Sequence, residues 1–580
     1  MCRIYGYLGS TADATMLEAA GDAQLSGGPD QQRHVTGTEW GLGCNRLAIQ
    51  GPASGTQPFG NAARTVHAVF NGEIYNFRAV RAELARHGVR VDGDSDGSVI
   101  VPYYEMYGDR FTERLEGMFA IAIMDLRGPR RLKLWCDPLA VKSLYYAPTG
   151  DGLVFASELT GLTALRKAPP DLDPTAIDEY FNWQCLPNGT SPYTGVSALR
   201  PGERLVADGS TVVVHGDAGQ HHPRDAYERT PAGLRELLTH EVTAMSGQPA
   251  KIALQLSGGL DSSILATMLR ERRSDVTAFH VSHEGRFSWA EHEYARDAAE
   301  RAGITMETAE IREADVPELL PAVVAALGAP NATPHALSAY VLFREISAAG
   351  FRVCFTGDGA DEQFGGYRRY STALGATGDD WAERYLDRLS LVPETEYRAL
   401  YTEGYRAHVD SRGSSRRRAR ELLAAPSERG RVERILEFDR IHKLPGLNLR
   451  KLDHLSMAHA VEARVPYCQP AVTRFARTTP DMWKVDGPHR KRILWDAGHD
   501  LIPPSVRQRD KQPFTFPVAE YLTPGRPLWT YAHDVLARPR LCTSGLLDER
   551  AVRTVLAEHA TGRDHARLIW GLLVLELSLP

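Results

Sequence analysis

The stretch Ser257-Gly258-Gly259-Leu260-Asp261-Ser262-Ser263 decides the fold of the central part of this chain. The apolar run 252–256 before it predicts a buried parallel strand, and the run 264–270 after it predicts a helix. Backbone N–H groups converge where a strand turns into a helix, and the helix dipole adds about half a positive charge there. We therefore expect an anion site in which the glycines admit a phosphate and Asp261 holds Mg²⁺.

This loop differs from a Walker A loop, because the spacing G-x-x-x-x-G-K-[ST] is absent. It resembles the pyrophosphate-binding loop of N-type ATP pyrophosphatases, which cleave ATP to AMP and pyrophosphate and activate a carboxylate as its acyl-adenylate. The resemblance implies an ATP site made of Leu256, Ser257, Gly258, Gly259, Leu260, Asp261, Ser262 and Ser263, with Val281 and Gly357 farther along the chain. The alternative is a Ser/Gly turn without a ligand.

Composition narrows the class of protein. The 580 residues are enough for two or more domains, and 43% of them are hydrophobic. The net charge of −6 argues against a nucleic-acid-binding surface. No apolar stretch approaches the roughly 20 residues that span a bilayer, and the first residues lack the apolar core of a signal peptide. The seven cysteines show no metal-ligand spacing, so we expect a cytoplasmic protein.

Strand-like runs dominate the first 200 residues, with few long helices between them. These runs, at 46–49, 67–70, 119–123 and 132–135, predict antiparallel sheets packed face to face with helices outside. We expect an α+β domain with αββα layering over residues 2–205. A polar stretch after Pro201-Gly202 predicts a linker over 206–230.

The pattern changes from residue 231 to residue 580. Helical runs alternate there with short apolar strands at 252–256, 276–281 and 353–356, which predicts an α/β domain with a doubly wound parallel sheet. From about residue 375 the chain is predicted to be largely helical. The stretch 412–420 carries five arginines and is predicted to be an exposed mobile loop.

Cys2 is the first candidate nucleophile. Removal of Met1 would leave thiol and α-amine on one residue, and an amine with a pKa of about 8 can serve as the local base. The stretch Asn71-Gly72-Glu73 follows a predicted strand, so the Asn71 amide and the Gly72 N–H could form an oxyanion hole. Taken alone, Cys2 would more often be a chance cysteine, and the Asn71-Gly72-Glu73 stretch is what favours the nucleophile.

Charged residues in the same region suit a zwitterion. Arg46 could hold a carboxylate in a bidentate fork, and Glu73 with Asp96 could hold an ammonium group. With Cys2 and Asn71, these residues make the first half resemble a class II (N-terminal nucleophile) glutamine amidotransferase domain. The whole chain resembles glutamine-dependent asparagine synthetase, including the stretches 115–120, 137–146 and 155–158.

The resemblance implies roles for these residues. Cys2 would attack the glutamine side-chain amide and release ammonia, Arg46 would hold the α-carboxylate, and Glu73 and Asp96 the α-amine. Two places depart from the family pattern: Ser26-Gly27 replace His-Arg, and Cys44-Asn45 replace a histidine and a basic residue. The nitrogen donor is therefore glutamine or a glutamine derivative such as a γ-glutamyl hydroxamate.

The stretch 351–362 repeats the pattern of a strand followed by glycines and resembles the second family signature. By that resemblance, Asp361 would join Asp261 in binding Mg²⁺ bridged to ATP, and Asp358 would face the acceptor. Lys511, in Arg509-Asp510-Lys511, would neutralise the departing pyrophosphate. Lys491 is a weaker phosphate candidate, and we expect it to be a surface charge on a helix.

The stretches 452–457 and 462–466 match a helical part of the family that lines the nucleotide and acceptor pocket. The alternative for these stretches is a buried Asp–Arg or Glu–Arg network, and for Glu462 and Arg464 the two interpretations are equal. The acceptor region departs from the family, since Tyr467-Cys468-Gln469 replaces Phe-Leu-Asp and Trp495 replaces an arginine. A less charged or larger acceptor than aspartate is therefore plausible.

These observations predict an ATP- and glutamine-dependent amide-forming ligase, in which ammonia passes through an internal tunnel to an adenylated carboxylate. Asparagine synthesis and a specialised acceptor in secondary metabolism both stay open. One alternative is an intramolecular cyclase of the β-lactam synthetase or lasso-peptide macrolactam synthetase type, and another is a regulatory protein with a vestigial ligase fold. The resemblance makes a homodimer plausible, with no nucleic-acid or membrane partner.

Overall fold

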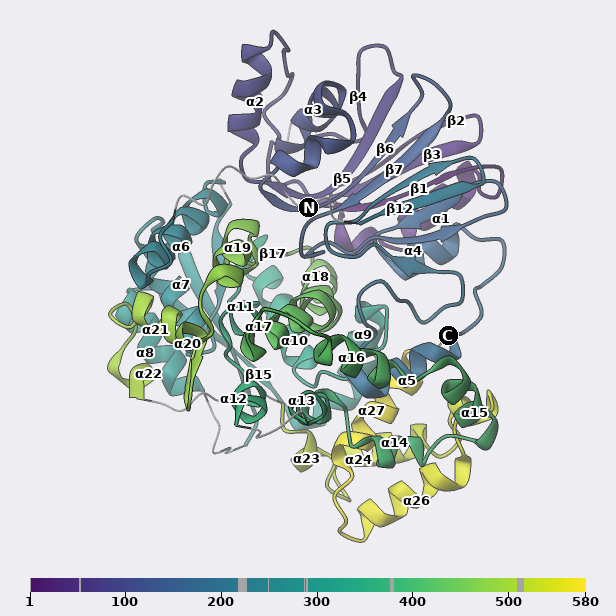
Figure 1. The fold of residues 1–580 in the computed structure, drawn as a ribbon, viewed down its shortest axis with the longest axis vertical. Coiled ribbons are helices and arrows are strands. Elements are labelled where there is room, and N and C mark those ends of the chain that lie inside the picture. Colours follow the sequence, from purple (N-terminus) through teal and green to yellow (C-terminus); the bar gives the residue numbers. More distant parts are fainter. Residues whose placement is uncertain are drawn as a thin grey trace.

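The computed structural model describes residues 2–579, except for 52–53, 217–226, 249, 286, 288–290, 376–379 and 509–515. Figure 1 shows two parts of different character. The first part, purple to blue, is built mainly of strands, and the second part, teal to yellow, is rich in helices.

Two six-stranded sheets form the first part. One has the order β10-β8-β9-β1-β3-β2 and the other the order β12-β11-β7-β6-β5-β4, with antiparallel pairing throughout both. The strands are β1 Cys2–Leu8, β2 Gln31–Gly37, β3 Trp40–Arg46, β4 Phe59–Gly60, β5 Val66–Ile74, β6 Gly117–Asp125, β7 Arg131–Cys136, β8 Tyr145–Pro148, β9 Leu153–Ala156, β10 Ser197–Ala198, β11 Arg204–Asp208 and β12 Thr211–His215.

Alternation along the strands distributes apolar side chains to both faces of each sheet. In β6, Ile121 and Ile123 pack toward helices α2 (Phe77–Arg86) and α3 (Ile100–Tyr107), whereas Ala120 and Ala122 pack between the sheets. The other sheet packs against α1 (Ala14–Asp22) and α4 (Leu159–Ala164). Cys2 and Cys44 lie in the apolar layer between the two sheets.

Two expectations for the first part need correction. Strand β3 ends at Arg46, so the run 46–49 is not a strand; the Ala48 N–H donates to the Asp30 carboxylate instead of to a neighbouring strand. Residues 206–215 fall in the expected linker, yet they form the end of β11 and all of β12, which extend the sheet beyond β7. The β-branched residues Val206 and Thr211 to Val214 favour this strand pairing.

Helix α5 (Pro174–Trp183) precedes these strands in the sequence but packs in the core of the second part. Its Tyr180 hydroxyl donates to the Gly571 carbonyl, 2.8 Å away, in the last helix of the chain. The two parts are therefore interleaved, and residues 2–205 do not form one compact unit.

The predicted parallel sheet of the second part is confirmed. Its order is β15-β14-β13-β16-β17, and every neighbouring pair is parallel. The strands are β13 Ile252–Gln255, β14 Val276–His283, β15 Thr305–Ile311, β16 Val353–Phe355 and β17 Glu462–Arg464. The turns after β13 and β16 therefore meet at the same edge of the sheet, where ligands bind in such folds.

Helices surround this sheet and continue to the end of the chain. Helix α6 Pro231–Met245 precedes β13, and the helices between or directly after strands β13 to β16 are α7 Leu260–Arg270, α8 His292–Ala302, α9 Val316–Leu327, α10 Ala336–Ala348 and α11 Ala360–Phe364. The others are α12 Arg368–Leu374, α13 Trp381–Leu389, α14 Glu394–Arg398, α15 Glu403–Arg412, α16 Ser415–Ala424, α17 Arg431–Phe438, the π-helix η5 Asp439–Leu449, α18 Arg450–Met457, α19 Pro470–Thr478, α20 Asp481–Lys484, α21 Arg492–Gly498, α22 Pro504–Gln508, α23 Val518–Tyr521, α24 Pro527–Val535, α25 Arg540–Thr543, α26 Glu549–Ala560 and α27 Ala566–Leu577.

Short 3₁₀ segments and one small hairpin complete the elements: η1 Leu25–Gly27, η2 Asp96–Val99, η3 Gly108–Arg114, η4 Glu313–Asp315, η6 Pro466–Cys468, β18 Val485–Asp486 and β19 His489–Arg490.

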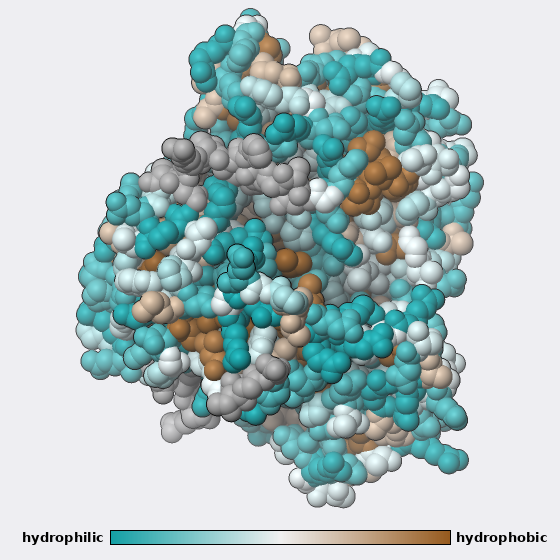
Figure 2. All heavy atoms as spheres, viewed as in Figure 1, coloured by the Kyte–Doolittle hydropathy of each residue, from teal (hydrophilic) through white to brown (hydrophobic). Residues whose placement is uncertain are grey.

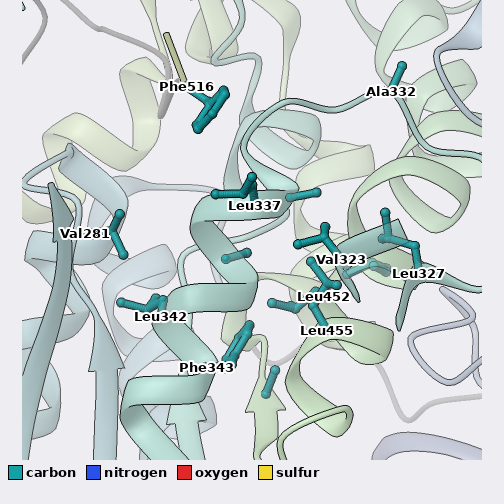
Figure 3. Close-up of a cluster of buried hydrophobic side chains, with 14 of the residues drawn as sticks. Val281, Val323, Leu327, Ala332, Leu337, Leu342, Phe343, Leu452, Leu455 and Phe516 are labelled. Carbon is teal, nitrogen blue, oxygen red and sulfur yellow. The ribbon is translucent and has the colours of Figure 1, made fainter. Parts of the chain in front are cut away.

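The core of the second part fixes helix α18 at the centre of the molecule. Figure 3 shows Leu452 and Leu455 of α18 beside Val323 and Leu327 of α9, with Phe343 of α10 close by. Burial of such side chains contributes about 1.5–3 kcal/mol each. Because the leucines anchor this helix, its charged residues are held in fixed directions between the two parts.

The arginine-rich stretch 412–420 is not the predicted exposed loop. It contains the beginning of α16, where Ser414 caps the helix by accepting from the Arg417 N–H. Arg416 is buried and pairs with Glu383 and Asp387 of α13. The helix cap and the acidic partners on α13 explain why this charged stretch is ordered.

The molecular surface in this view is mostly hydrophilic (Figure 2). An apolar patch lies where Figure 1 places the edge strand β12, whose Val213 and Val214 are 44% and 39% exposed. Within the described residues, no helix has both the length and the apolar character that a membrane crossing requires.

Candidate active sites in the two parts

Cys2 opens β1 directly opposite Arg46, the last residue of β3. Its Sγ accepts a hydrogen bond from Gln57 Nε2 at 3.2 Å. Gln57 is held in place by Phe70, whose carbonyl accepts from Gln57 Nε2 at 2.9 Å and whose N–H donates to Oε1 at 2.7 Å. Sequence reasoning missed Gln57, because no motif marks it and only the folded sheet brings it to the thiol.

The Cys2 thiol has a lowered pKa. Burial raises this pKa, but a hydrogen bond with Cys44 and the positive charges of the amino terminus and Arg46 outweigh burial and bring it to about 7. Burial and the neighbouring Cys2 raise the pKa of Cys44 well above its usual range. At neutral pH Cys2 is thus the better nucleophile of the two, because the thiolate is the reactive form.

Asn71 lies in β5 beside Cys2. Its Oδ1 accepts from the Cys2 N–H at 3.1 Å, which orients the side-chain amide. Among the residues that the structure describes, the buried Nδ2 of Asn71 has no hydrogen-bond partner. A buried donor without a partner is costly in a folded protein. The arrangement suits the donor of an oxyanion hole, and Gly72 follows directly in the same strand.

The expected glutamine-binding residues surround the same centre. The Arg46 guanidinium donates to the carbonyls of Gly51 at 2.9 Å and Gln50 at 3.2 Å, which fixes its direction. Asp96 accepts from the Ile74 N–H at 3.0 Å. Burial raises the pKa of Asp96 to about 6 and that of Glu73 well above its usual range, with nearby carboxylates adding to both effects. Raised pKa values of this kind mean that the two acids would gain from a nearby cation.

Glu73 also reaches the second part of the chain. Its Oε1 lies 3.4 Å from Arg464 Nη2, and Arg464 Nε lies 2.5 Å from Glu462 Oε1. Gln248 and the Met245 carbonyl accept from the other guanidinium nitrogen. The expected Glu–Arg network is therefore present, and it extends across the boundary between the two parts.

The expected phosphate loop has the predicted strand–turn–helix geometry. Ser257 to Gly259 form the turn between β13 and α7, and Leu260 to Ser263 already belong to the first turn of the helix. Gly258 has φ +69°, and a Cβ there would lie 2.5 Å from the backbone nitrogen of Ala295. Only glycine fits this backbone.

Serine hydroxyls shape the interior of this turn. Ser262 Oγ accepts from the Ser257 N–H at 3.3 Å and lies 3.2 Å from Ser257 Oγ. Ser263 Oγ is buried and has no hydrogen-bond partner among the described residues. The turn thus has a hydroxyl left to donate at the N-terminus of α7, where an anion binds most readily.

Lys491 is not the expected surface charge. Its ammonium is buried between the two acids predicted to bind Mg²⁺, 2.5 Å from Asp261 Oδ2 and 2.7 Å from Asp361 Oδ1. Gly366 leaves the room for this arrangement, because a Cβ there would lie 1.7 Å from Asp361 Oδ1 and 2.1 Å from Lys491 Cε. Sequence reasoning missed the contact because it depends on the distant α21 lying over the loops.

The two aspartates fit a hard cation. They already converge on one positive group, and Asp261 Oδ1 is buried without a partner in the described part of the chain. The described residues contain no group of three or more His, Cys, Asp or Glu that could hold a metal alone. A magnesium ion that keeps waters and phosphate oxygens as its other ligands needs only two carboxylates.

Asp358 and Gly357 follow β16 on the acceptor side. Gly357 packs against Asp261, since a Cβ there would lie 3.1 Å from Asp261 Cβ. Lys451 of α18 is 4% exposed, and in the described part of the chain its ammonium has no ion pair. Burial lowers the pKa of Lys451, and the charges of Asp358 and Glu362 oppose that shift. A buried ammonium near two acids suits an anionic group of a ligand.

Asp453 forms the buried Asp–Arg network that was the alternative for this stretch. It pairs with Arg3 at 2.8 Å and Lys142 at 2.6 Å, both from the first part, and all three side chains are buried. Val281 in β14 belongs to the apolar core, and Figure 3 places it near Leu342. Lys511 lies outside the described residues, so its role stays a prediction.

A family model described as asparagine synthase matches residues 233–580, well over half of the chain. The chain belongs to the asparagine synthase family. A second model, described as a glutamine amidotransferase domain, matches residues 1–215. The predicted combination of the two domains is confirmed, and β12 falls within the first of them.

Full-length relatives in this family are distant. The chain is 25% identical to "Asparagine synthetase [glutamine-hydrolyzing] 1" of Bacillus subtilis (strain 168), over 98% of this chain and 94% of that one. It is 24% identical to the third such synthetase of the same organism, over 89% and 87%. A protein named "Amidase chry2" from Gibberella zeae is 24% identical over 93% and 90%. As an asparagine synthase family member, the protein is an asparagine synthetase-like, glutamine-dependent amidotransferase.

Proposed function

We propose that the protein is a glutamine-hydrolysing, ATP- and Mg²⁺-dependent ligase that converts an acceptor carboxylate into an amide. The observation that carries the proposal is that one chain contains both a candidate glutamine site and a candidate ATP site. One places the Cys2 thiol beside Asn71, whose Nδ2 has no partner among the described residues. The other places the turn after β13 beside two carboxylates that converge on the Lys491 ammonium.

At the first centre, the Cys2 thiolate attacks the side-chain carbonyl of glutamine. Asn71 Nδ2 and the Gly72 N–H donate to the oxyanion that forms, and Arg46 holds the α-carboxylate. Glu73 and Asp96 hold the α-ammonium. Their raised pKa values favour the protonated acids in the empty site, and the ammonium takes over the positive charge of those protons when glutamine binds. The amine freed on Cys2 by removal of Met1 takes the thiol proton and gives it to the leaving –NH2 group, which departs as ammonia. Water then hydrolyses the thioester on Cys2, which releases glutamate and restores the thiol.

At the second centre, the turn 257–259 and the N-terminus of α7 bind the ATP phosphates. Asp261 and Asp361 would hold Mg²⁺, which would neutralise phosphate charge, and Lys491 would then be free to contact a phosphate oxygen. Lys511 neutralises the leaving pyrophosphate. The Lys451 ammonium binds an anionic group of the acceptor beside Asp358. We thus favour an acidic acceptor, although Cys468-Gln469 and Trp495 depart from the family pattern.

The deciding experiment incubates the protein with ATP, Mg²⁺, labelled glutamine and a panel of carboxylates that includes aspartate, and follows AMP, glutamate and the labelled amide. We expect Cys2→Ala to lose glutamate release while ammonia-dependent AMP formation persists. Loss of both activities would contradict the separation of the two centres. AMP formed without any nitrogen source would favour the cyclase alternative.

A further inference from the structure

Four charged side chains from both parts of the chain form one buried group beside the glutamine site. Glu73 and Asp96 come from the first part, and Glu462 and Arg464 from β17 of the second part. Glu73, Glu462 and Arg464 are all less than 3% exposed. Glu73 and Glu462 thus share the Arg464 guanidinium, and burial raises the pKa of Glu73, with the carboxylates of Glu462 and Asp96 adding to that rise. Any cation that binds Glu73 must compete with Arg464.

Arg464 is joined through its backbone to the acceptor loop. It pairs with Phe355 in the neighbouring strand β16, and its carbonyl accepts from the Thr356 N–H at 3.0 Å. Thr356 immediately precedes Gly357 and Asp358. A shift of Arg464 along its strand is therefore transmitted to the residues that begin this loop.

The residues after Arg464 contact both loops of the second centre. The Tyr467 hydroxyl donates to the Asp261 carbonyl at 3.1 Å, and Cys468 Sγ lies 3.6 Å from the Asp358 carbonyl. Both side chains are buried. The segment 462–468 is thus one short piece of backbone. Near its beginning Arg464 contacts Glu73, and near its end Tyr467 and Cys468 contact the loops expected to bind Mg²⁺ and the acceptor.

We propose that Arg464 is a positioning residue through which occupancy of the glutamine site changes the affinity of the second centre for ATP·Mg²⁺. An ammonium group between Glu73 and Asp96 weakens the pull of Glu73 on Arg464. The guanidinium then shifts toward Glu462, and segment 462–468 carries the shift to Asp261 and Asp358. This inference rests on the proposed roles of both centres.

Thermodynamic linkage supplies the test. We define the coupling factor as the ratio by which one ligand changes the dissociation constant of the other, and this ratio must be the same for glutamine acting on ATP·Mg²⁺ as for ATP·Mg²⁺ acting on glutamine. In a Cys2→Ala protein, glutamine binds without being consumed. We expect ATP·Mg²⁺ to change the dissociation constant of glutamine by about fivefold or more, and glutamine to change that of ATP·Mg²⁺ by the same factor. Calorimetry measures both, without knowledge of the acceptor.

Two variants in this background locate the connection. Tyr467→Phe keeps the ring and removes only the hydroxyl that contacts Asp261, and Arg464→Lys keeps the charge but not the planar fork. We expect both to bring the coupling factor close to one. Tyr180→Phe is the matched control, since its buried hydroxyl also donates to a backbone carbonyl, that of Gly571, far from segment 462–468 in the sequence. It should keep the coupling factor of the Cys2→Ala protein.

Three results would overturn the inference. They are a coupling factor of one in Cys2→Ala, an unchanged factor in both Tyr467→Phe and Arg464→Lys, and an equal loss in Tyr180→Phe. Failure of the proposed function has a different signature: the unmodified protein would neither release glutamate from glutamine nor bind ATP·Mg²⁺. A protein that does both but shows no linkage would refute the role of Arg464 alone.

Discussion

The ammonium of Lys491 lies 2.5 Å from the Asp261 carboxylate, at the point where the sequence predicts a magnesium ion. The same ammonium reaches Asp361 at 2.7 Å. Two half-buried carboxylates that face each other without a cation would repel, so Lys491 stabilises the pair when no metal is bound. If Mg²⁺ replaced the Lys491 ammonium between the two carboxylates, the ammonium would be free to contact a phosphate oxygen.

Replacing Lys491 by methionine should therefore tighten metal binding in the absence of ATP. The two carboxylates lose their cation, and we expect Mg²⁺ to bind at least about tenfold more tightly while AMP formation falls by more than about tenfold. Calorimetric titration with Mg²⁺ measures the first effect. Arg492→Met, which removes an exposed cation paired with Asp486, is the control. Unchanged Mg²⁺ affinity in Lys491→Met would contradict the assignment of these aspartates.

Asn71→Ala should slow glutamine hydrolysis without affecting the second centre. Loss of one oxyanion donor typically lowers kcat by about 10²–10³-fold, and we expect the KM for glutamine to change little. Steady-state glutamate release measures this, with ammonia-dependent AMP formation as the internal reference. Asn188→Ala is a matched control, because Asn188 Nδ2 is also buried without a partner among the described residues. Equal losses in both variants would rule out the oxyanion role.

Asp96 makes glutamine binding depend on pH. Since its pKa is raised to about 6, the charged form that binds ammonium appears only as pH rises through 6. We expect the KM for glutamine to fall between pH 5 and 7 and then to level off, with the change lost in Asp96→Asn. A KM profile that stays flat in the unmodified protein would contradict this.

The same shift predicts a cost to stability. A carboxyl whose folded pKa lies above its unfolded value stabilises the fold below pH 4, and this contribution is lost as pH rises through 6. Asp96→Asn can still accept from the Ile74 N–H. We expect it to raise the melting temperature at pH 8 but not at pH 4. A lower melting temperature at pH 8 would show that the Asp96 charge is stabilising.

Asp453→Asn should destabilise the junction of the two parts. It leaves the buried Arg3 and Lys142 with one carboxylate partner, Glu158, which lies 2.6 Å from Arg3, and such a change costs about 3–5 kcal/mol. The pKa of Asp453 lies below its usual range because Arg3 and Lys142 outweigh the effect of burial. Its contribution is therefore present above about pH 4 and lost as pH falls through the folded pKa.

Thermal unfolding across this pH range checks the prediction. The melting temperature of Asp453→Asn should fall by several degrees at pH 7, with a smaller difference at pH 3. The combined variant Arg3→Met, Lys142→Met, Asp453→Leu should recover part of the loss, since no buried charge is then left unpaired at Asp453. An Asp453→Asn protein as stable as the unmodified one at pH 7 would contradict the role of this group.

Local sequence was enough to predict the parallel sheet, the turn at 257–259 and the residues around Cys2. Each is encoded by a short continuous stretch in which apolar periodicity, glycine and a reactive side chain coincide. Two wrong predictions of local structure concern stretches whose structure depends on residues far away in the sequence. The run 46–49 is apolar but is not a strand, and 412–420 is charged but begins an ordered helix, because in both cases a partner distant in the sequence decides the structure.

The family could be predicted from the sequence alone, and so could the loops proposed to carry the two chemistries, since those loops need specific residue types at fixed spacing. The folded molecule was needed to place the residues around them: Gln57 on the Cys2 thiol, Lys491 between Asp261 and Asp361, and Arg464 against Glu73. Buried charges and donors acquire partners through packing, and packing joins residues hundreds of positions apart. For that reason the catalytic stretches can be read along the chain, whereas the connection between them depends on the fold.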